Sequence, residues 1–187
     1  TADHIARKLA VHFVSDSPDP ALVAHIAGRY RSSGGDLMAV YSALLEHPAA
    51  WQPALANVKP PFGFAASVIR ALDVPAARLK AAPPRDVRRG IVLPLQMMGQ
   101  DWEYPAGPDG WPEDDARWIT PQGLSARMGW AMAAPSQLLD RLPEPESFAR
   151  AGLGSYADQR VRFAARAAET RAEAIGLVLS SPAFQRR

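Results

Sequence analysis

The chain has 187 residues, a formal net charge of +2 and no cysteine. Its length suits one globular domain, and the missing cysteine excludes disulfides, thiolate metal sites and a cysteine nucleophile. A net charge this small cannot drive non-specific binding to phosphate backbones, so we expect no nucleic-acid partner.

Apolar residues recur at helical spacing in about seven segments of the chain. Asp3 is predicted to cap the first helix and Asp36 the third. Asp19-Pro20 and Thr120-Pro121 combine a capping residue with a proline at the first helical position. Pro94 should kink the fifth helix or end it one turn early. The predicted helices span about 3–14, 20–33, 36–47, 62–72, 87–98, 121–132 and 156–179.

The stretches between these helices are predicted connections. Residues 74–86 form a linker that can include a short turn, Pro135 restarts a short helical piece, and 141–155 is a loop. No run alternates with a period of two, so no strands are predicted. The uncharged stretches are much shorter than the about 20 residues that span a membrane. We therefore expect a soluble, single helical domain over residues 1–187, an all-α irregular bundle of about seven helices with one long loop.

That loop, residues 99–118, reads GQDWEYPAGPDGWPEDDARW and contains three tryptophans and six carboxylates. A long proline-rich loop in a compact domain is usually functional or disordered, and its tryptophans argue against disorder. It is therefore the predicted binding site. Two interpretations stay open: the tryptophans contact a partner, or they dock the loop onto the helices while the acids stay solvated. The candidate binding residues are Gln100, Asp101, Trp102, Trp111 and Trp118.

Patterns typical of catalytic or metal sites do not occur. The loop acids do not match the calcium-loop spacing, and His4 and His12 lie two helical turns apart, too far to share a metal. The chain has no G-x-S-x-G nucleophile motif and no phosphate-binding glycine loop. We expect no metal and no cofactor, and no catalytic residue can be named.

Several ordered motifs resemble one known family. They are ARKLAVHFV, GGDLMAVYSALLEHPAAW, KPPFGFAASVIRALDV, the run from MGQ to GWP, W-x5-L-x2-R and LSSPAFQRR, at residues 6–14, 34–51, 59–74, 98–112, 118–127 and 179–187. In this order they resemble the C-terminal part of the bacterial family called domain of unknown function 1800. Its members are typically more than twice as long, so the resemblance implies the C-terminal half of a longer protein.

The resemblance implies no activity, cofactor or catalytic residue, because none is established for the family. Many members are exported, which implies an exported or periplasmic location, although the residues themselves leave a cytoplasmic one open. Their genes often lie beside those of a second exported family that resembles alkaline phosphatases and sulfatases. A protein of that kind is the partner that the resemblance suggests.

Three hypotheses about function follow. The leading one is a non-catalytic protein-interaction module that binds through the loop, with an exposed apolar patch around Trp111. The alternative is a hydrolase that acts on an extracellular polymer through loop carboxylates such as Asp101 and Asp115, which requires both in one cleft. The third is a purely structural scaffold half.

Overall fold

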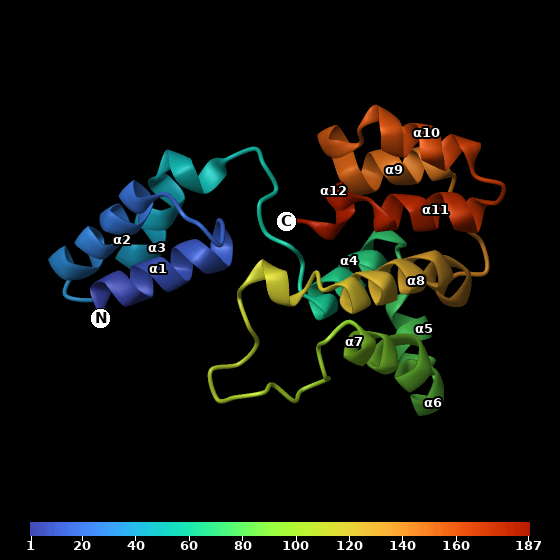
Figure 1. Cartoon of the computed structure of the whole chain (residues 1–187), viewed down its shortest axis with the longest axis horizontal. Helices are drawn as coiled ribbons and strands as arrows, with labels where there is room; N and C mark the ends of the chain where they lie inside the picture. Colours follow the sequence, from blue (N-terminus) through green and yellow to red (C-terminus); the bar gives the residue numbers. More distant parts are fainter. The chain divides into compact units, whose positions relative to one another are not determined.

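The computed structural model describes every residue from Thr1 to Arg187 and is built from helices (Figure 1). Its only extended pairings are two isolated bridges, between Val58 and Arg186 and between Gly107 and Gly110. The predicted all-α class is therefore confirmed. The chain forms two compact units, Thr1–Asn57 and Val58–Arg187. A single domain over residues 1–187 stays a prediction.

The first unit consists of α1 (Ala2–Phe13), α2 (Pro20–Ser32), α3 (Leu37–Glu46) and a 3-10 turn, η1 (Pro48–Trp51). Its core is formed where Ala6 and Ala10 of α1 meet larger residues such as Leu22 and Ile26 of α2, all fully buried. Small residues on α1 allow the helices to approach closely, so a short bundle can still bury a continuous apolar core.

Local capping fixes where these helices begin. The predicted caps are confirmed at α2 and α3, where Asp19 accepts a hydrogen bond from the backbone N–H of Ala21 and Asp36 one from Met38. The predicted cap of α1 is wrong. Thr1 occupies the N-cap position, and Asp3 lies within the first turn and pairs with Arg31 at 2.6 Å.

The second unit contains the remaining helices. Its α-helices are α4 (Pro61–Ala71), α5 (Ala76–Ala81), α6 (Pro84–Val87), α7 (Leu93–Met97), α8 (Pro121–Leu138), α9 (Pro145–Leu153), α10 (Gln159–Ala167), α11 (Arg171–Ser180) and α12 (Pro182–Gln185). A π-helical turn, η2 (Arg88–Val92), joins α6 to α7, and 3-10 turns occur at η3 (Asp115–Arg117) and η4 (Gly154–Tyr156). Figure 1 shows α8 and α11 side by side, with α4 and α9 beside them.

The core of this unit is an aromatic and aliphatic cluster at the junction of α4, α8, α11 and α12. The Phe64 ring lies 5.7 Å from Trp130 and 6.1 Å from Phe184, both edge-on. Ile175 and Val178 of α11 are fully buried against the same cluster. Edge-to-face contacts of this kind add to the free energy gained by burying the rings.

The predicted last helix, 156–179, is wrong in one respect, because it is two helices. The chain leaves the helical conformation at Ala168, and Thr170 caps α11 by accepting from the N–H of Glu173 at 3.1 Å. The Glu173 carboxylate in turn accepts from the N–H of Glu169. This Thr-x-x-Glu arrangement is close to a capping box, a signal that the uninterrupted Ala/Arg-rich composition obscured.

Two further expectations are corrected. Residues 141–155 are not a loop, because they contain α9, which begins where Glu144 accepts from the N–H groups of Glu146 and Ser147. The helix forms because Phe148 and Leu153 are buried in the core. Pro135 does not restart a helix but lies inside α8, which continues to Leu138.

Pro94 does not end the predicted fifth helix early, because α7 continues past it to Met97. The predicted helix 87–98 consists of α6, the π-helical turn η2 and α7, with Pro94 in the first turn of α7. A proline cannot donate its backbone hydrogen bond and clashes with the preceding turn, and the turn before Pro94 is π-helical, a form that occurs mostly as single turns within α-helices. The turn is tied to the core by Trp130, whose indole Nε1 donates to the carbonyl of Gly90 at 2.7 Å.

Candidate functional site

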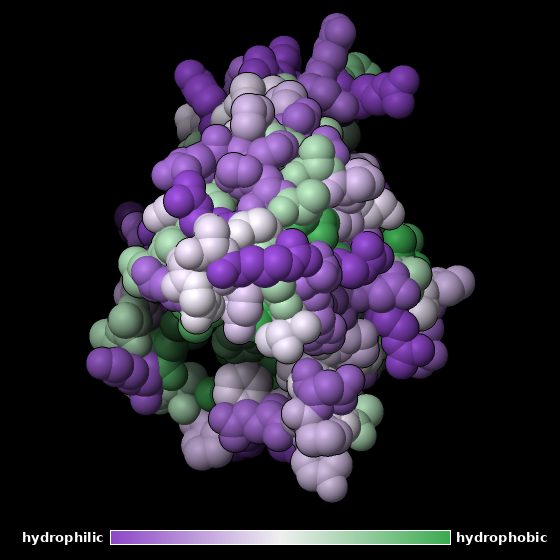
Figure 2. All heavy atoms as spheres, turned by 90° about the vertical axis from the view of Figure 1, so that its left-hand side faces the viewer, coloured by the Kyte–Doolittle hydropathy of each residue, from purple (hydrophilic) through white to green (hydrophobic).

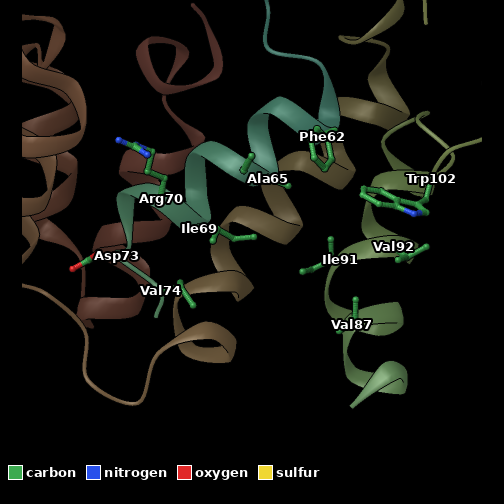
Figure 3. Close-up of a pocket in the computed structure, with 11 residues that line it drawn as sticks. Phe62, Ala65, Ile69, Arg70, Asp73, Val74, Val87, Ile91, Val92 and Trp102 are labelled. Carbon is green, nitrogen blue, oxygen red and sulfur yellow. The ribbon is translucent and has the colours of Figure 1, made fainter. Parts of the chain in front are cut away.

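One recess of the second unit is an apolar groove of about 820 Å³, here named the α4 groove. One wall is α4 and the residues after it, and the other is formed by α6 and the π-helical turn. Figure 3 shows the two walls facing each other, with Trp102 at one end. Aliphatic side chains form most of the lining, namely Ala65, Ile69, Val74, Val87, Ile91 and Val92.

Two aromatic residues stand at the mouth of the α4 groove. Phe62 is 49% exposed and Trp102 is 47% exposed, and their ring centroids lie 5.4 Å apart. Phe62 is held by Gln100, whose side-chain oxygen accepts from the Phe62 backbone N–H at 2.7 Å. The buried Gln100 amide therefore has a positioning role at this mouth, and it connects the start of the loop to the start of α4.

The wall opposite α4 contacts the core through partly buried side chains such as Leu79 and Ile91. Between Ala76 and Val92 no side chain is fully buried, and a second recess of about 730 Å³ lies between this segment and Trp130 and Leu138 of α8. Besides the Trp130 hydrogen bond, a bidentate ion pair between Arg78 and Asp140 holds the segment. The hydrogen bonds from Arg78 keep the pKa of the Asp140 carboxyl group below its ordinary value.

The three loop tryptophans have different environments. Trp118 is buried, at 2% exposure, and its Nε1 donates to the Pro112 carbonyl at 3.2 Å. Trp111 is half-buried, with its ring centroid 6.4 Å from that of Trp118. Trp102 alone stands at the α4 groove. The loop is therefore anchored at its end and at Trp102, while residues 103–106 are exposed, so it does not pack along its whole length.

The loop carboxylates are not gathered in a cleft. Asp101 is exposed, whereas Asp115 accepts from the backbone N–H of Val58 at 2.8 Å. Asp114 caps the 3-10 turn η3 by accepting from the N–H of Ala116. No group of three or more histidine, aspartate or glutamate side chains is placed to hold a metal ion. Asp114 and Asp115 thus support the local fold of the loop.

A buried guanidinium that the sequence reasoning did not single out lies at the centre of the unit. Arg127 of α8 has no exposed surface, and it donates to the Lys59 carbonyl at 2.7 Å and to the Gln185 side-chain oxygen at 3.1 Å. Its guanidinium carbon lies 5.4 Å from the Phe64 ring centroid. Burial lowers the pKa of Arg127 to about 10, so it remains charged at neutral pH.

The first unit also exposes large apolar side chains, on the outer side of α3 and on η1. Met38 is 70% exposed and Trp51 is 67% exposed, while the Trp51 indole donates to the Leu45 carbonyl at 2.6 Å. On the face shown in Figure 2, hydrophilic residues predominate, with hydrophobic residues in small groups between them. None of the helices is both long and apolar enough to cross a membrane.

A family model described as "Protein of unknown function (DUF1800)" matches residues 1–186. The chain belongs to the DUF1800 family. This confirms the resemblance drawn from the ordered motifs. No match to the chain was found among curated proteins or among solved structures.

Four of the six motifs that carry the DUF1800 resemblance contact one another in the second unit. Lys59 and Phe62 come from the KPPFGF motif, Gln100 from MGQ, Arg127 from the W-x5-L-x2-R motif and Gln185 from the C-terminal motif. The hydrogen bonds described above join them in two groups, one around Arg127 and one at the mouth of the α4 groove. The sequence contains a signal for the buried arginine, because Arg127 interrupts the apolar stripe of a predicted helix. Only its hydrogen-bond partners in the structure show that it is buried.

Proposed function

We propose that this DUF1800 chain is a non-catalytic protein-interaction module whose α4 groove receives the apolar side chains of a partner helix. The observation that carries the proposal is the pair of half-exposed aromatic rings, Phe62 and Trp102, at the mouth of an apolar groove. Large apolar side chains left in water beside a recess are costly for a monomer and are common at interaction sites.

The shape of the groove favours a helical partner. Its two walls are helical segments, and a groove between helices is a common receptor for the apolar face of an amphipathic helix. Aliphatic walls supply the apolar surface, and the two rings supply the rigid anchors typical of binding hot spots. The polar side chains of Arg70 and Asp73 lie at the end of the groove away from Trp102 (Figure 3), where they can contact the polar face of the same helix.

The loop contributes to this proposal through Trp102 rather than through its carboxylates. Asp101 lies beside Trp102 in the sequence and is exposed, so it is available to a basic residue of a partner. Asp115 is engaged with the Val58 backbone. A hydrolytic pair made of these two acids would need a shared cleft, and neither lines the α4 groove. The arrangement therefore supports binding better than hydrolysis.

The test is the selection of helical peptides from a display library on the purified chain, followed by fluorescence anisotropy with each selected peptide. We expect Trp102→Ala to weaken binding at least about tenfold, the loss typical of a hot-spot residue. Tyr104→Ala is the matched control, because Tyr104 is a 79% exposed aromatic residue of the same loop that does not line the groove. Its variant should bind like the wild type.

Peptides that bind both variants equally well, or the absence of any enriched peptide, would contradict the proposal. The first full-length partner to test in the same assay is the exported phosphatase-like or sulfatase-like protein that the family resemblance suggests. Competition between that protein and a selected peptide would place it in the α4 groove.

A further inference from the structure

A smaller and more polar hollow lies on another side of α4. It has a volume of about 420 Å³ and lies between α4, the C-terminal part of α9 and Phe184. Arg70 belongs to it, and Figure 3 shows that this side chain points away from the aliphatic interior of the α4 groove. The other polar residues of the lining are Lys59 and Ser67, and no carboxylate is among them.

Lys59 is a partly buried cation without an acidic partner. Its ammonium donates to the Phe184 carbonyl at 2.7 Å and lies 4.3 Å from the centroid of the Phe184 ring. An ammonium has three donors, so two remain for a ligand. Removal from water is the cause that lowers the pKa of Lys59, and no carboxylate acts against it.

The neighbourhood adds further positive charge. The carbonyl of Lys59 accepts from Arg127, a second buried cation whose acceptors are both neutral. Arg70 is exposed at the edge of the hollow and makes no ion pair. Charges withdrawn from water are normally paired, and opposite charges attract more strongly where the effective dielectric constant is low. The hollow therefore has two cationic side chains, Lys59 and Arg70, and no carboxylate in its lining.

We propose that this hollow binds a small oxyanion, a phosphate or sulfate group, between Lys59 and Arg70. Ser67 and Arg70 are three residues apart on α4 and thus on the same helical face, so the serine hydroxyl and the guanidinium can donate to one anion. Lys59 donates from the other side. The guanidinium is suited to this role because its planar donors match the oxygen atoms of phosphate or sulfate. Arg70 also lies at the end of the α4 groove, so the two proposed sites share this side chain, whereas Lys59 and Ser67 line only the hollow.

The test is a titration of the isotope-labelled chain with inorganic phosphate, and separately with sulfate, at constant ionic strength in chloride buffer. Binding should be saturable and should shift the NMR signals of Ser67 and of Gly152, which also lines the hollow. We expect Arg70→Gln to weaken phosphate binding about tenfold, as for the loss of one charge-assisted hydrogen bond. Arg70 is exposed, so this variant should fold normally.

Lys59→Gln is the second variant, with thermal unfolding measured to confirm that it is folded. The control is Arg89→Gln, because Arg89 is an exposed arginine that lines a different recess. It should bind phosphate like the wild type. Two results would overturn the proposal: no saturable binding of either anion, or binding that all three variants retain equally, which would mean non-specific association with a basic surface.

Discussion

The contact between α8 and α11 depends on one glycine. A Cβ atom at Gly176 of α11 would lie 2.9 Å from the Cα atom of Met132 and 3.3 Å from the carbonyl oxygen of Ala131, both in the backbone of α8. It would also lie 2.6 Å from the Met132 sulfur, which can rotate away. Because two of these contacts are with backbone, Gly176→Ala can be accommodated only if the helices move apart.

Two opposing effects decide the outcome of Gly176→Ala. Alanine is favoured over glycine in a helix by about 1 kcal/mol, whereas overpacking of a close-packed core costs about 1–3 kcal/mol. The backbone clash places this site toward the upper part of that range. We therefore expect the free energy of unfolding to fall by about 1–2 kcal/mol. The loss would come from the packing of α8 against α11, which supplies much of the core of the second unit.

Gly129→Ala is the matched control, because Gly129 lies in the interior of α8 and an added Cβ would have no neighbour within 4 Å. Only the helix preference acts there, so the variant should be more stable by about 0.5–1 kcal/mol. Urea denaturation followed by circular dichroism measures both. If Gly176→Ala is as stable as Gly129→Ala, the close approach of α11 to α8 does not exist and the reasoning is refuted.

Three further outcomes are expected. Asp73 has a φ of 51° after the last turn of α4, a backbone conformation in which glycine is favoured. Asp73→Gly should therefore raise the free energy of unfolding by about 0.5–1 kcal/mol. A lower free energy of unfolding, measured by urea denaturation, would contradict this. Trp130→Phe removes the hydrogen bond to the Gly90 carbonyl and should lower the free energy of unfolding by about 1–2 kcal/mol. Amide hydrogen exchange in the π-helical turn should also become faster. An unchanged exchange rate would show that this hydrogen bond does not stabilise the turn. The hydrogen bonds from Arg78 lower the pKa of Asp140, so their stabilisation is complete above the unfolded-state pKa and is lost as the pH falls through the lower, folded-state pKa. In the Asp140→Asn variant, the free energy of unfolding should therefore fall less over that acidic range than in the wild type. An unchanged pH profile of the free energy of unfolding would show that the Arg78–Asp140 pair does not contribute to stability.

The start of a helix could be predicted where a preferred capping residue stands directly before the apolar pattern of the helix. Asp19, Asp36 and Thr120 each accept from a backbone N–H two or three residues later, as their positions predicted. The cap at Glu144 was missed because glutamate is not among the preferred capping residues. The break before α11 was missed although Thr170 and Glu173 are spaced for a capping box.

The candidate site was only partly predictable. The tryptophans single out the loop, and its role as a binding site stays a prediction, but composition cannot say which of its rings is buried. Trp118 is buried beside Trp111 and Pro112 of the same loop, whereas Trp102 stands at a groove because its neighbour Phe62 lies on α4. The contact between Phe62 and Trp102 joins residues that are far apart in the chain, and no periodicity within one helix encodes it.

The sequence by itself determined the helical class, the capped starts of α2, α3 and α8, and the position of the loop, since these depend on hydrogen bonds and apolar spacing within a few residues. Only the tertiary structure decided that Arg127 is buried between the Lys59 carbonyl and Gln185. It alone decided that Gln100 supports Phe62, and that Lys59 and Arg70 share one hollow. The physical reason is that burial and pairing depend on which distant segments pack together, which is settled by the free energy of the whole core.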